Sequence, residues 1–289
     1  MNRSLLGCAL TVACAFVFSG CSQPPPPDTG DDWVGPQGTW QQVFFDDFTG
    51  PAGSAPDATT WNEEVNGKPD NGEQEYYTNR PSNVALDGNG NLVITALKEN
   101  YAYATGLVSN QPYTSGRIDT QGHLEPTYGR IEARIKLPKG KGMWPAFWLL
   151  GNNIGSVGWP TCGEIDILEL AGSDPNEVRG SLHGPGYSGT GAFTADYTLG
   201  SGSFNDDFHV FALEWTADGM RWKVDENIYH TRTKTGVEGY GYTWVFDHPF
   251  YVILNLAVGG FFDGNPDSST EFPNTMLVDY VKVSKLIPN

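Results

Sequence analysis

Short apolar and alternating segments, separated by turn signals, follow one another along most of the chain. Tyr128–Pro138 alternates polar and apolar residues and ends at a proline, which cannot donate to a β-ladder. Phe250–Val258 is largely apolar, as expected of a strand that is buried on both faces. We predict further strands over Trp40–Phe48, Gly90–Ala96, His209–Trp215, Arg221–Asp225 and Leu277–Val283. Because no long helical period and no repeat follows residue 38, the pattern predicts an all-β fold of two packed antiparallel sheets.

The segment Gly163–Glu169 combines three carboxylates with branched apolar residues that are typical of a buried strand. Residues two apart on a strand share a face, so Glu164 and Asp166 point the same way. Glu169 lies five residues after Glu164 and points to the other face unless a β-bulge absorbs one residue. With that bulge, all three acids line one face, where like charges raise one another's pKa.

The spacing of these acids indicates what they can do. Four strand steps of about 3.3 Å separate the Cα atoms of Glu164 and Glu169 by roughly 13 Å. Side chains that lean together leave ~5 Å between the carboxyl groups, the separation used for glycoside hydrolysis with retention. One carboxylate attacks the sugar carbon, and the other, held protonated by Asp166, donates to the leaving oxygen. Two alternatives for this strand alone are an acidic face in solvent and a metal cluster.

Composition agrees with a sugar-binding β-protein and excludes one class of partner. The 289 residues are 13% aromatic, with 9 Trp and 13 Tyr, and include 36 Gly and 20 Pro, as in turn-rich all-β proteins. Flat aromatic rings stack on the apolar faces of sugars, although core packing is the commoner role of any single ring. The net charge of −17 excludes a basic nucleic-acid footprint and favours a neutral polysaccharide over a sulfated one.

Several further motifs surround the acidic strand in a fixed order: Asn71–Thr78, Met143–Gly151, Gly158–Cys162, Leu182–Tyr187, Leu254–Gly260 and Val278–Val283. Over about residues 38–286 this set resembles glycoside hydrolase family 16, and in particular its laminarinase-like branch of endo-β-1,3-glucanases. The family's lichenase branch has one residue fewer between its outer glutamates, so the spacing here favours the bulged, laminarinase-like type. The resemblance implies a concanavalin-like β-jelly-roll sandwich whose concave sheet forms the substrate cleft.

The resemblance also implies roles for individual residues. Glu164 matches the family's nucleophile, Glu169 its general acid/base and Asp166 its assisting aspartate, in a retaining endo-glycosidase that cleaves internal β-1,3 or mixed β-1,3/1,4 linkages of neutral β-glucan. His183 matches a histidine near the acid pair, and the loop Gly259–Gly264 is expected to rim the cleft. Candidates for sugar stacking are Trp144, Trp148 and Trp159, and candidates for hydrogen bonds to glucose hydroxyls are Tyr77, Arg117 and Asn255. For each of these, a structural role is the alternative.

Two other functions stay open at this point. The first is a non-catalytic β-glucan-binding protein, although such a relative is expected to have lost one of the outer acids. The second is a hydrolase or transglycosylase for another β-linked polysaccharide. The resemblance implies no cofactor for catalysis, but it does imply a structural calcium ion held by Asp47, the carbonyl of Gly90 and Asp279. The alternative for Asp279 is a residue that caps a turn.

The N-terminus has the pattern of an export signal. Residues 1–20 combine a basic start with a short apolar run, and Phe18–Cys21 resembles a bacterial lipoprotein cleavage box in which Cys21 is lipidated. Residues 21–38 form a Pro- and Asp-rich linker, and residues 39–289 form the catalytic domain. We therefore expect an exported cell-envelope lipoprotein that touches the membrane only through its lipid; a secreted protein is the alternative. The domain keeps one cysteine, Cys162, as a buried filler, and nothing requires more than a monomer.

Overall fold

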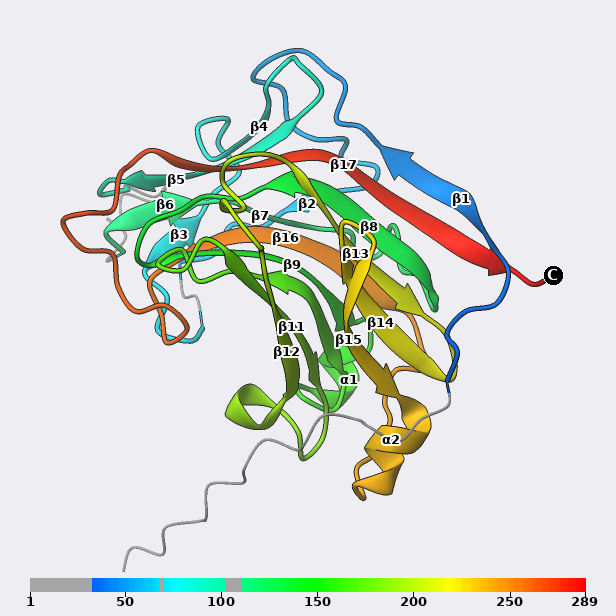
Figure 1. Cartoon of the computed structure of the whole chain (residues 1–289). Helices are drawn as coiled ribbons and strands as arrows, with labels where there is room; N and C mark the ends of the chain where they lie inside the picture. Colours follow the sequence, from blue (N-terminus) through cyan, green and yellow to red (C-terminus); the bar gives the residue numbers. More distant parts are fainter. Residues whose placement is uncertain (1–32, 68–69, 102–110) are drawn as a thin grey trace, which may run out of the picture.

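The computed structural model describes residues 33–67, 70–101 and 111–289, and the predicted signal segment with Cys21 lies outside them. Within these residues two curved, almost wholly antiparallel sheets stack into a sandwich (Figure 1). This arrangement confirms the predicted all-β fold. The two helices α1 (Ile154–Val157) and α2 (Lys234–Gly239) and the 3-10 turn η1 (Gly189–Gly191) lie in connections. None of the described helices is long and apolar enough to cross a membrane.

The ten-stranded sheet, called the outer sheet here, is built around the long C-terminal strand. Its strands run in the order β15 (Asn227–Thr233), β14 (Gly219–Val224), β13 (His209–Trp215), β8 (Gly129–Lys136), β17 (Asn274–Ile287), β5 (Leu92–Lys98), β6 (Tyr113–Ser115) and β3 (Glu75–Tyr77), with β1 (Thr39–Asp46) paired to β17 and β4 (Val84–Leu86) paired to β5. Among the strands that the structure describes, only β3 and β6 pair in parallel.

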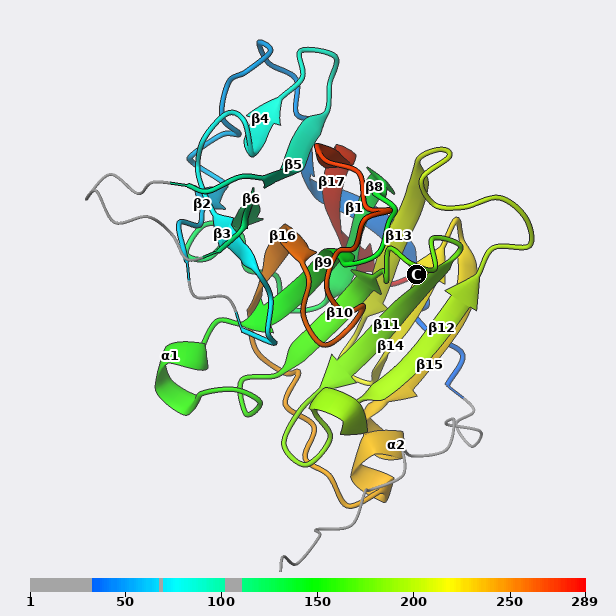
Figure 2. The same cartoon turned by 90° about the vertical axis from the view of Figure 1, so that its left-hand side faces the viewer.

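The seven-stranded sheet, called the cleft sheet here, carries the acidic strand near its centre. Its order is β12 (Phe193–Thr198), β11 (Glu177–His183), β10 (Glu164–Glu169), β9 (Met143–Gly151), β16 (Phe250–Val258), β7 (Arg117–Asp119) and β2 (Asn62–Glu63). Figure 2 shows β9, β10, β11 and β12 side by side in this sheet. The acids therefore sit on a broad, continuous β-surface.

The core lies between the two sheets and explains the apolar run of β16. All nine residues of this strand are buried. Phe250, Val252, Leu254, Leu256 and Val258 face the core, where they join large side chains from the outer sheet. On the opposite face Ile253 belongs to a second apolar cluster, together with Leu150, Tyr251 and Cys162. The strand is thus covered on both faces, as the sequence predicts, and Cys162 is a buried free thiol.

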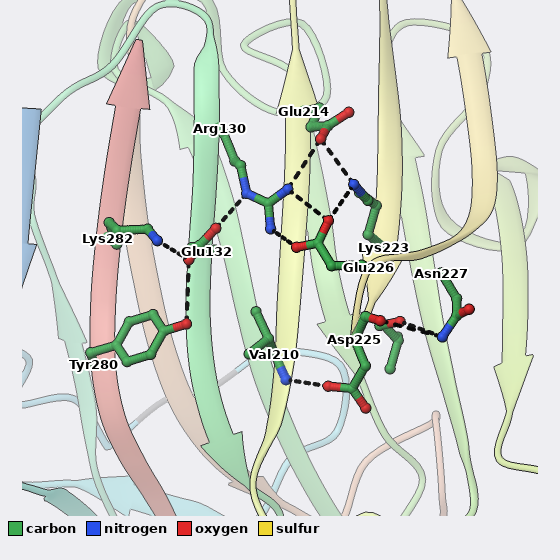
Figure 3. A network of polar contacts seen from close by, with 11 residues as sticks. Arg130, Glu132, Val210, Glu214, Lys223, Asp225, Glu226, Asn227, Tyr280 and Lys282 are labelled. Carbon is green, nitrogen blue, oxygen red and sulfur yellow. Dashed lines mark hydrogen bonds and ion pairs between the residues drawn. The ribbon is translucent and has the colours of Figure 1, made fainter. Parts of the chain in front are cut away.

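The solvent side of the outer sheet holds a dense network of ion pairs around Arg130 (Figure 3). Its guanidinium contacts Glu132, Glu214 and Glu226. Lys223 bridges Glu214 and Glu226 at 3.1 and 2.6 Å, so neighbouring strands share the charges. At the other end, Lys282 and Tyr280 both reach Glu132. Three cations face three carboxylates, which leaves the network electrically balanced.

Candidate active site

The three acids of β10 share one face because the strand is bulged. Glu164 pairs with Leu150 and Glu169 with Ala146 on β9, so five residue steps on β10 oppose four on the partner. On β11 the partners are His183 and Arg179, again four steps apart. The register shifts after Asp166 on both sides, which makes Ile167 the additional residue. The predicted bulge is confirmed.

The bulge is supported from behind by the outer sheet. Trp222 of β14 donates its indole N–H to the carbonyl of Asp166 at 2.8 Å, and Tyr229 of β15 donates to the carbonyl of Ile167 at 3.4 Å. Gly180 of β11 makes this approach possible, because a Cβ there would lie 2.6 Å from both the Trp222 ring and the Tyr229 hydroxyl. The carbonyls of Asp166 and Ile167, at the bulge, therefore each accept a hydrogen bond from a side chain of the outer sheet.

Strand register aligns the neighbouring side chains with each acid in rows across the cleft sheet. The row through Glu164 includes His183 of β11. The row through Asp166 runs from Ile253 and Trp148 to Ser181. The row through Glu169 runs, in order, through Arg117, Asn255, Ala146, Glu169, Arg179 and Asp196. Five strands thus bring predicted site residues from distant parts of the sequence to one surface.

Glu164 and Glu169 each accept an indole N–H. Trp159, on the loop before β10, donates to Oε2 of Glu164 at 3.0 Å, and its ring is 48% exposed. Trp144 of β9 donates to Oε1 of Glu169 at 3.0 Å. Ser181 lies 3.4 Å from the other Glu169 oxygen. Each carboxyl group is therefore held by a different aromatic residue, at opposite ends of β10.

His183 links the acids at the centre of the cluster. Its Nε2 lies 2.9 Å from Oδ2 of Asp166 and 3.8 Å from Oε1 of Glu164. The backbone N–H of Gly189 donates to Nδ1 at 3.1 Å. We assign the ring proton of the neutral imidazole to Nε2 from this contact, since Nδ1 must be an acceptor. His183 therefore presents an N–H toward the carboxylates.

The hydrogen bond from Gly189 to Nδ1 of His183 also bears on whether this cluster binds a metal. Among the described residues, Glu164, Asp166 and His183 are the one group of His, Cys, Asp and Glu whose ligand atoms lie within 4.8 Å of one another. A ligating histidine needs its lone pair on the metal side and donates its other N–H to an acceptor. Here a backbone donor occupies Nδ1. The arrangement fits a hydrogen-bonded acid cluster better than a metal centre.

Burial controls the protonation of the acids. It raises the pKa of Glu164, Asp166 and Glu169 far above the usual carboxyl range, and the charge of Asp166 raises the two glutamates further. His183 and the indole N–H groups lower the pKa of both glutamates and so act in the opposite direction. The cluster therefore retains protons near neutral pH, so that a protonated acid and an ionised carboxylate can coexist.

A second group of predicted residues lies beside the acids on β9, β16 and β7. The Arg117 guanidinium stacks over the Trp148 ring at 5.0 Å and pairs with Glu64 at 2.7 Å. Trp148 donates to Oδ1 of Asn255 at 2.8 Å. Asn255 in turn donates to the hydroxyl of Tyr77 at 3.2 Å. These contacts form one continuous relay that fixes the Trp148 ring.

Tyr77 takes a different place from the one expected from the sequence. Its side chain is only 1% exposed, and β3 pairs with β6 at the edge of the outer sheet. The hydroxyl is already engaged by Asn255. Tyr77 therefore supports the site through Asn255 and does not reach a bound sugar directly.

Other residues of the site do not stand out in the sequence. Phe262, on the predicted rim loop, stacks on Trp144 with ring centroids 5.1 Å apart. Arg179 forms an ion pair with Asp196 at 2.7 Å, and it does not belong to any of the sequence motifs described above. The period of two along β11 was the available signal, because Arg179 and Ser181 share a face with His183.

The three residues expected to hold calcium converge at one corner of the outer sheet, away from the acids. On β17, Val278 pairs with Leu92 and Val281 with Asp46, which places Asp279 between the two neighbouring strands. A Cβ on Gly90 would lie 3.7 Å from the carbonyl oxygen of Asp47. The Asp279 carboxylate is also held by Arg134 at 2.7 Å. Arg134 therefore engages the Asp279 carboxylate, and the calcium ion stays a prediction.

Comparison with known proteins agrees with this geometry. A protein named Beta-glucanase from Rhodothermus marinus is 36% identical over 283 residues, covering 94% of this chain and 94% of the relative. A glucan endo-1,3-beta-glucosidase from Cryptopygus antarcticus is 38% identical over 263 residues, covering 85% and 92%. The solved endo-beta-1,3-glucanase of Pyrococcus furiosus superposes with a TM-score of 0.81 at 48% identity, covering 87% and 97%. Residues 71–282 match Glycosyl hydrolases family 16, and the chain therefore belongs to that family.

Proposed function

We propose that this glycoside hydrolase cleaves internal β-1,3 linkages of neutral β-glucan, with mixed β-1,3/1,4 glucan as a second substrate, by a retaining double displacement. The observation that carries the proposal is the bulge after Asp166, which puts Glu164 and Glu169 on one face. Two carboxyl groups that flank the scissile bond of the sugar, one ionised and one protonated, are what this chemistry requires. The names of the similar proteins support glucan as the substrate.

In the first step, Glu164 attacks the anomeric carbon as the bond to the leaving oxygen breaks, and Glu169 donates its proton to that oxygen. In the second step, Glu169 accepts a proton from water, whose oxygen displaces Glu164 from the sugar and restores the starting configuration. Asp166 lies between them, and its charge raises the pKa of Glu169. His183 presents its N–H to Asp166 and stabilises the charge that this residue carries.

Two substitutions test this assignment. Glu164→Gln should lower the turnover of laminarin by several orders of magnitude, roughly what loss of a nucleophile costs, while glucan binding persists. Glu169→Ala should recover part of its rate when azide is added, because azide needs no general base. Glu238→Gln, on α2, is the matched control. Full turnover by folded Glu164→Gln would refute the mechanism.

Proton NMR of the products from laminarin, lichenan, agarose and curdlan reports linkage and anomeric configuration together. A β-anomer as the first product from laminarin supports retention, and an α-anomer would overturn it. Binding of glucan without any cleavage by the wild type would instead identify a glucan-binding protein. Preferential cleavage of agarose would move the substrate to another β-linked polysaccharide.

We also propose that the protein is exported and anchored to the cell envelope through a lipid on Cys21. The support is the short apolar run followed by Phe18–Cys21 and a proline-rich tether. Cys21→Ala should move the protein from the membrane fraction to the soluble fraction. Membrane fractionation that does not change would refute the anchor, and Cys162→Ala is the control.

A structural calcium ion at Asp47, Gly90 and Asp279 is a further proposal. The support is that the segments carrying these residues are neighbours at the corner where β17 changes partners. Chelation should lower the unfolding midpoint, and added calcium should restore it, because a ligand that binds only the folded state stabilises it. Asp47→Ala should abolish this response; a midpoint that is indifferent to chelator in the wild type would exclude the ion.

A further inference from the structure

We propose that Phe261 is a stacking platform for a pyranose ring of the glucan chain and extends the binding surface beyond the catalytic acids. This inference rests on the proposed function, which it deepens by assigning a preference for long chains. Phe261 is 87% exposed, the largest exposed fraction of any large hydrophobic residue in the described chain. At this exposure the ring makes little contact with the rest of the protein, so it is available to a ligand.

The Phe261 ring is held in place by the backbone of another loop. The backbone N–H of Phe261 donates to the carbonyl of Asn71 at 2.9 Å. A Cβ built on Gly72, which has φ +74°, would lie 3.1 Å from the ring. The base of the loop is joined to the same segment, since Gln74 donates to the carbonyl of Val258 at 2.7 Å. The backbone that carries the ring is therefore fixed before a ligand binds, which reduces the ordering of the loop that binding requires.

The loop also connects Phe261 to the catalytic cluster. The next residue, Phe262, stacks on Trp144, and Trp144 donates to Glu169. A Cβ on Gly260 would lie 3.4 Å from the Trp144 ring, so the loop rests on that indole. Phe261 thus follows directly on an aromatic surface that begins at a catalytic acid. A sugar chain that leaves the acids on this side meets its ring next.

The occupant is a sugar because the surroundings suit one. Sugars have apolar C–H faces that pack on aromatic rings and hydroxyls that need polar neighbours. Asn71 and Glu73 lie on the segment beneath Phe261 and are hydrogen-bonded to each other at 3.2 Å. An exposed ring beside polar groups, continuous with the cleft, fits a neutral polysaccharide better than an apolar partner. Binding energy gained here reaches only substrates long enough to cover the ring.

The test compares long and short substrates. Phe261→Ala should lower kcat/KM on laminarin about tenfold, corresponding to ~1.4 kcal/mol, mainly through KM. The shortest laminari-oligosaccharide that the wild type cleaves should be hydrolysed at an unchanged rate. Phe261→Trp should retain or improve activity on the polymer. Phe45→Ala is the matched control, because this ring is 46% exposed on β1 of the outer sheet.

Each result decides one point. Equal kcat/KM of Phe261→Ala and wild type on laminarin would overturn the platform. An equal loss on short and long substrates would also overturn it, since it would indicate a disturbed loop and not a lost contact. Failure of the wild type to cleave any glucan would refute the proposed function itself, and this is seen before the variants are compared. Loss of laminarin affinity in Glu164→Gln/Phe261→Ala, relative to Glu164→Gln, would support the platform without turnover.

Discussion

The indole N–H of Trp159 donates to Oε2 of Glu164 at 3.0 Å, and this contact has a counterpart at the other end of the strand. There Trp144 donates to Glu169 at the same distance. Both hydrogen bonds lower the pKa of the acceptor, because they stabilise its ionised form. Two chemically equal donors thus act separately on the two carboxyl groups that the proposed mechanism needs in opposite protonation states.

Replacing each tryptophan by phenylalanine should therefore move a different limb of the pH–rate profile. Trp159→Phe raises the pKa of Glu164, so the acidic limb of kcat/KM, where the nucleophile ionises, should shift to higher pH. Trp144→Phe raises the pKa of Glu169, so the alkaline limb, where the acid loses its proton, should shift upward. The profiles of the two variants are each other's control. Both limbs moving together in either variant would contradict the separate assignment.

Much of the fold could be predicted because short apolar or alternating segments are separated by turn signals. His209–Trp215 and Phe250–Val258 coincide with β13 and β16. The prediction for Leu277–Val283 is too short, because β17 extends to Asn274–Ile287 by exchanging β5 for β1 as its partner. Trp40–Phe48 is too long, since Phe48 has φ 51° and has left the strand. Partner exchange and local turns depend on the whole sheet and leave no period in the sequence.

The candidate site, like the fold, could be predicted from the sequence only in part. The bulge could be predicted, because a spacing of five between two acids conflicts with a period of two unless one residue is absorbed. Its supports could not, because Trp222 and Tyr229 come from the other sheet and read as ordinary core residues. Tyr77 sits in a family-like motif, yet its side chain is only 1% exposed and its hydroxyl is engaged by Asn255. Contacts between the two sheets depend on how the sheets pack on each other, and the sequence pattern of a single strand does not predict this packing.

The stability of the fold should depend on pH through Asp166. Burial raises its pKa from 3.8 to about 8 in the folded protein. Because the folded pKa exceeds the unfolded one, its contribution is fully present below pH 3.8 and is lost as pH rises through about 8. Asp166→Asn should therefore gain stability relative to the wild type across this window, by at most about 1.4 kcal/mol per pH unit. Denaturant unfolding at several pH values measures the difference; parallel curves for the two proteins would refute it.

The Arg130 network should stabilise the fold without affecting catalysis, since it lies on the solvent side of the outer sheet (Figure 3). Glu132 and Glu214 are largely buried, and both form an ion pair with Arg130. Arg130→Met removes this shared partner. The expected loss is about 3–5 kcal/mol of unfolding free energy, with kcat unchanged at low temperature. Lys234→Ala, which breaks the exposed pair with Asp247, should leave the midpoint unaltered.

Arg130→Met should also change how the free energy of unfolding depends on pH in the acid range. Hydrogen bonding to Arg130 lowers the pKa of Glu226 to about 2. A lowered pKa gives stability that is present above the unfolded value of 4.5 and is lost as pH falls through about 2. Arg130→Met should lose much of this acid dependence. An undiminished slope between these pH values would show that Glu226 is stabilised by other groups.

The bulge itself can be tested by changing the length of β10. Deleting Ile167 gives a regular strand in which Glu164, Asp166 and Glu169 still share a face, because four steps then oppose four on β9. The protein should keep its activity to within about tenfold but lose roughly 2–4 kcal/mol, since a buried side chain is removed and Tyr229 loses the Ile167 carbonyl as its acceptor. Inserting an alanine after Leu168 turns Glu169 toward the core and should abolish turnover, by about three orders of magnitude or more. Specific activity of the folded protein and the unfolding midpoint, measured together, separate the two effects. An active insertion variant beside an inactive deletion variant would mean that the length of the strand, and not the face on which Glu169 lies, governs catalysis.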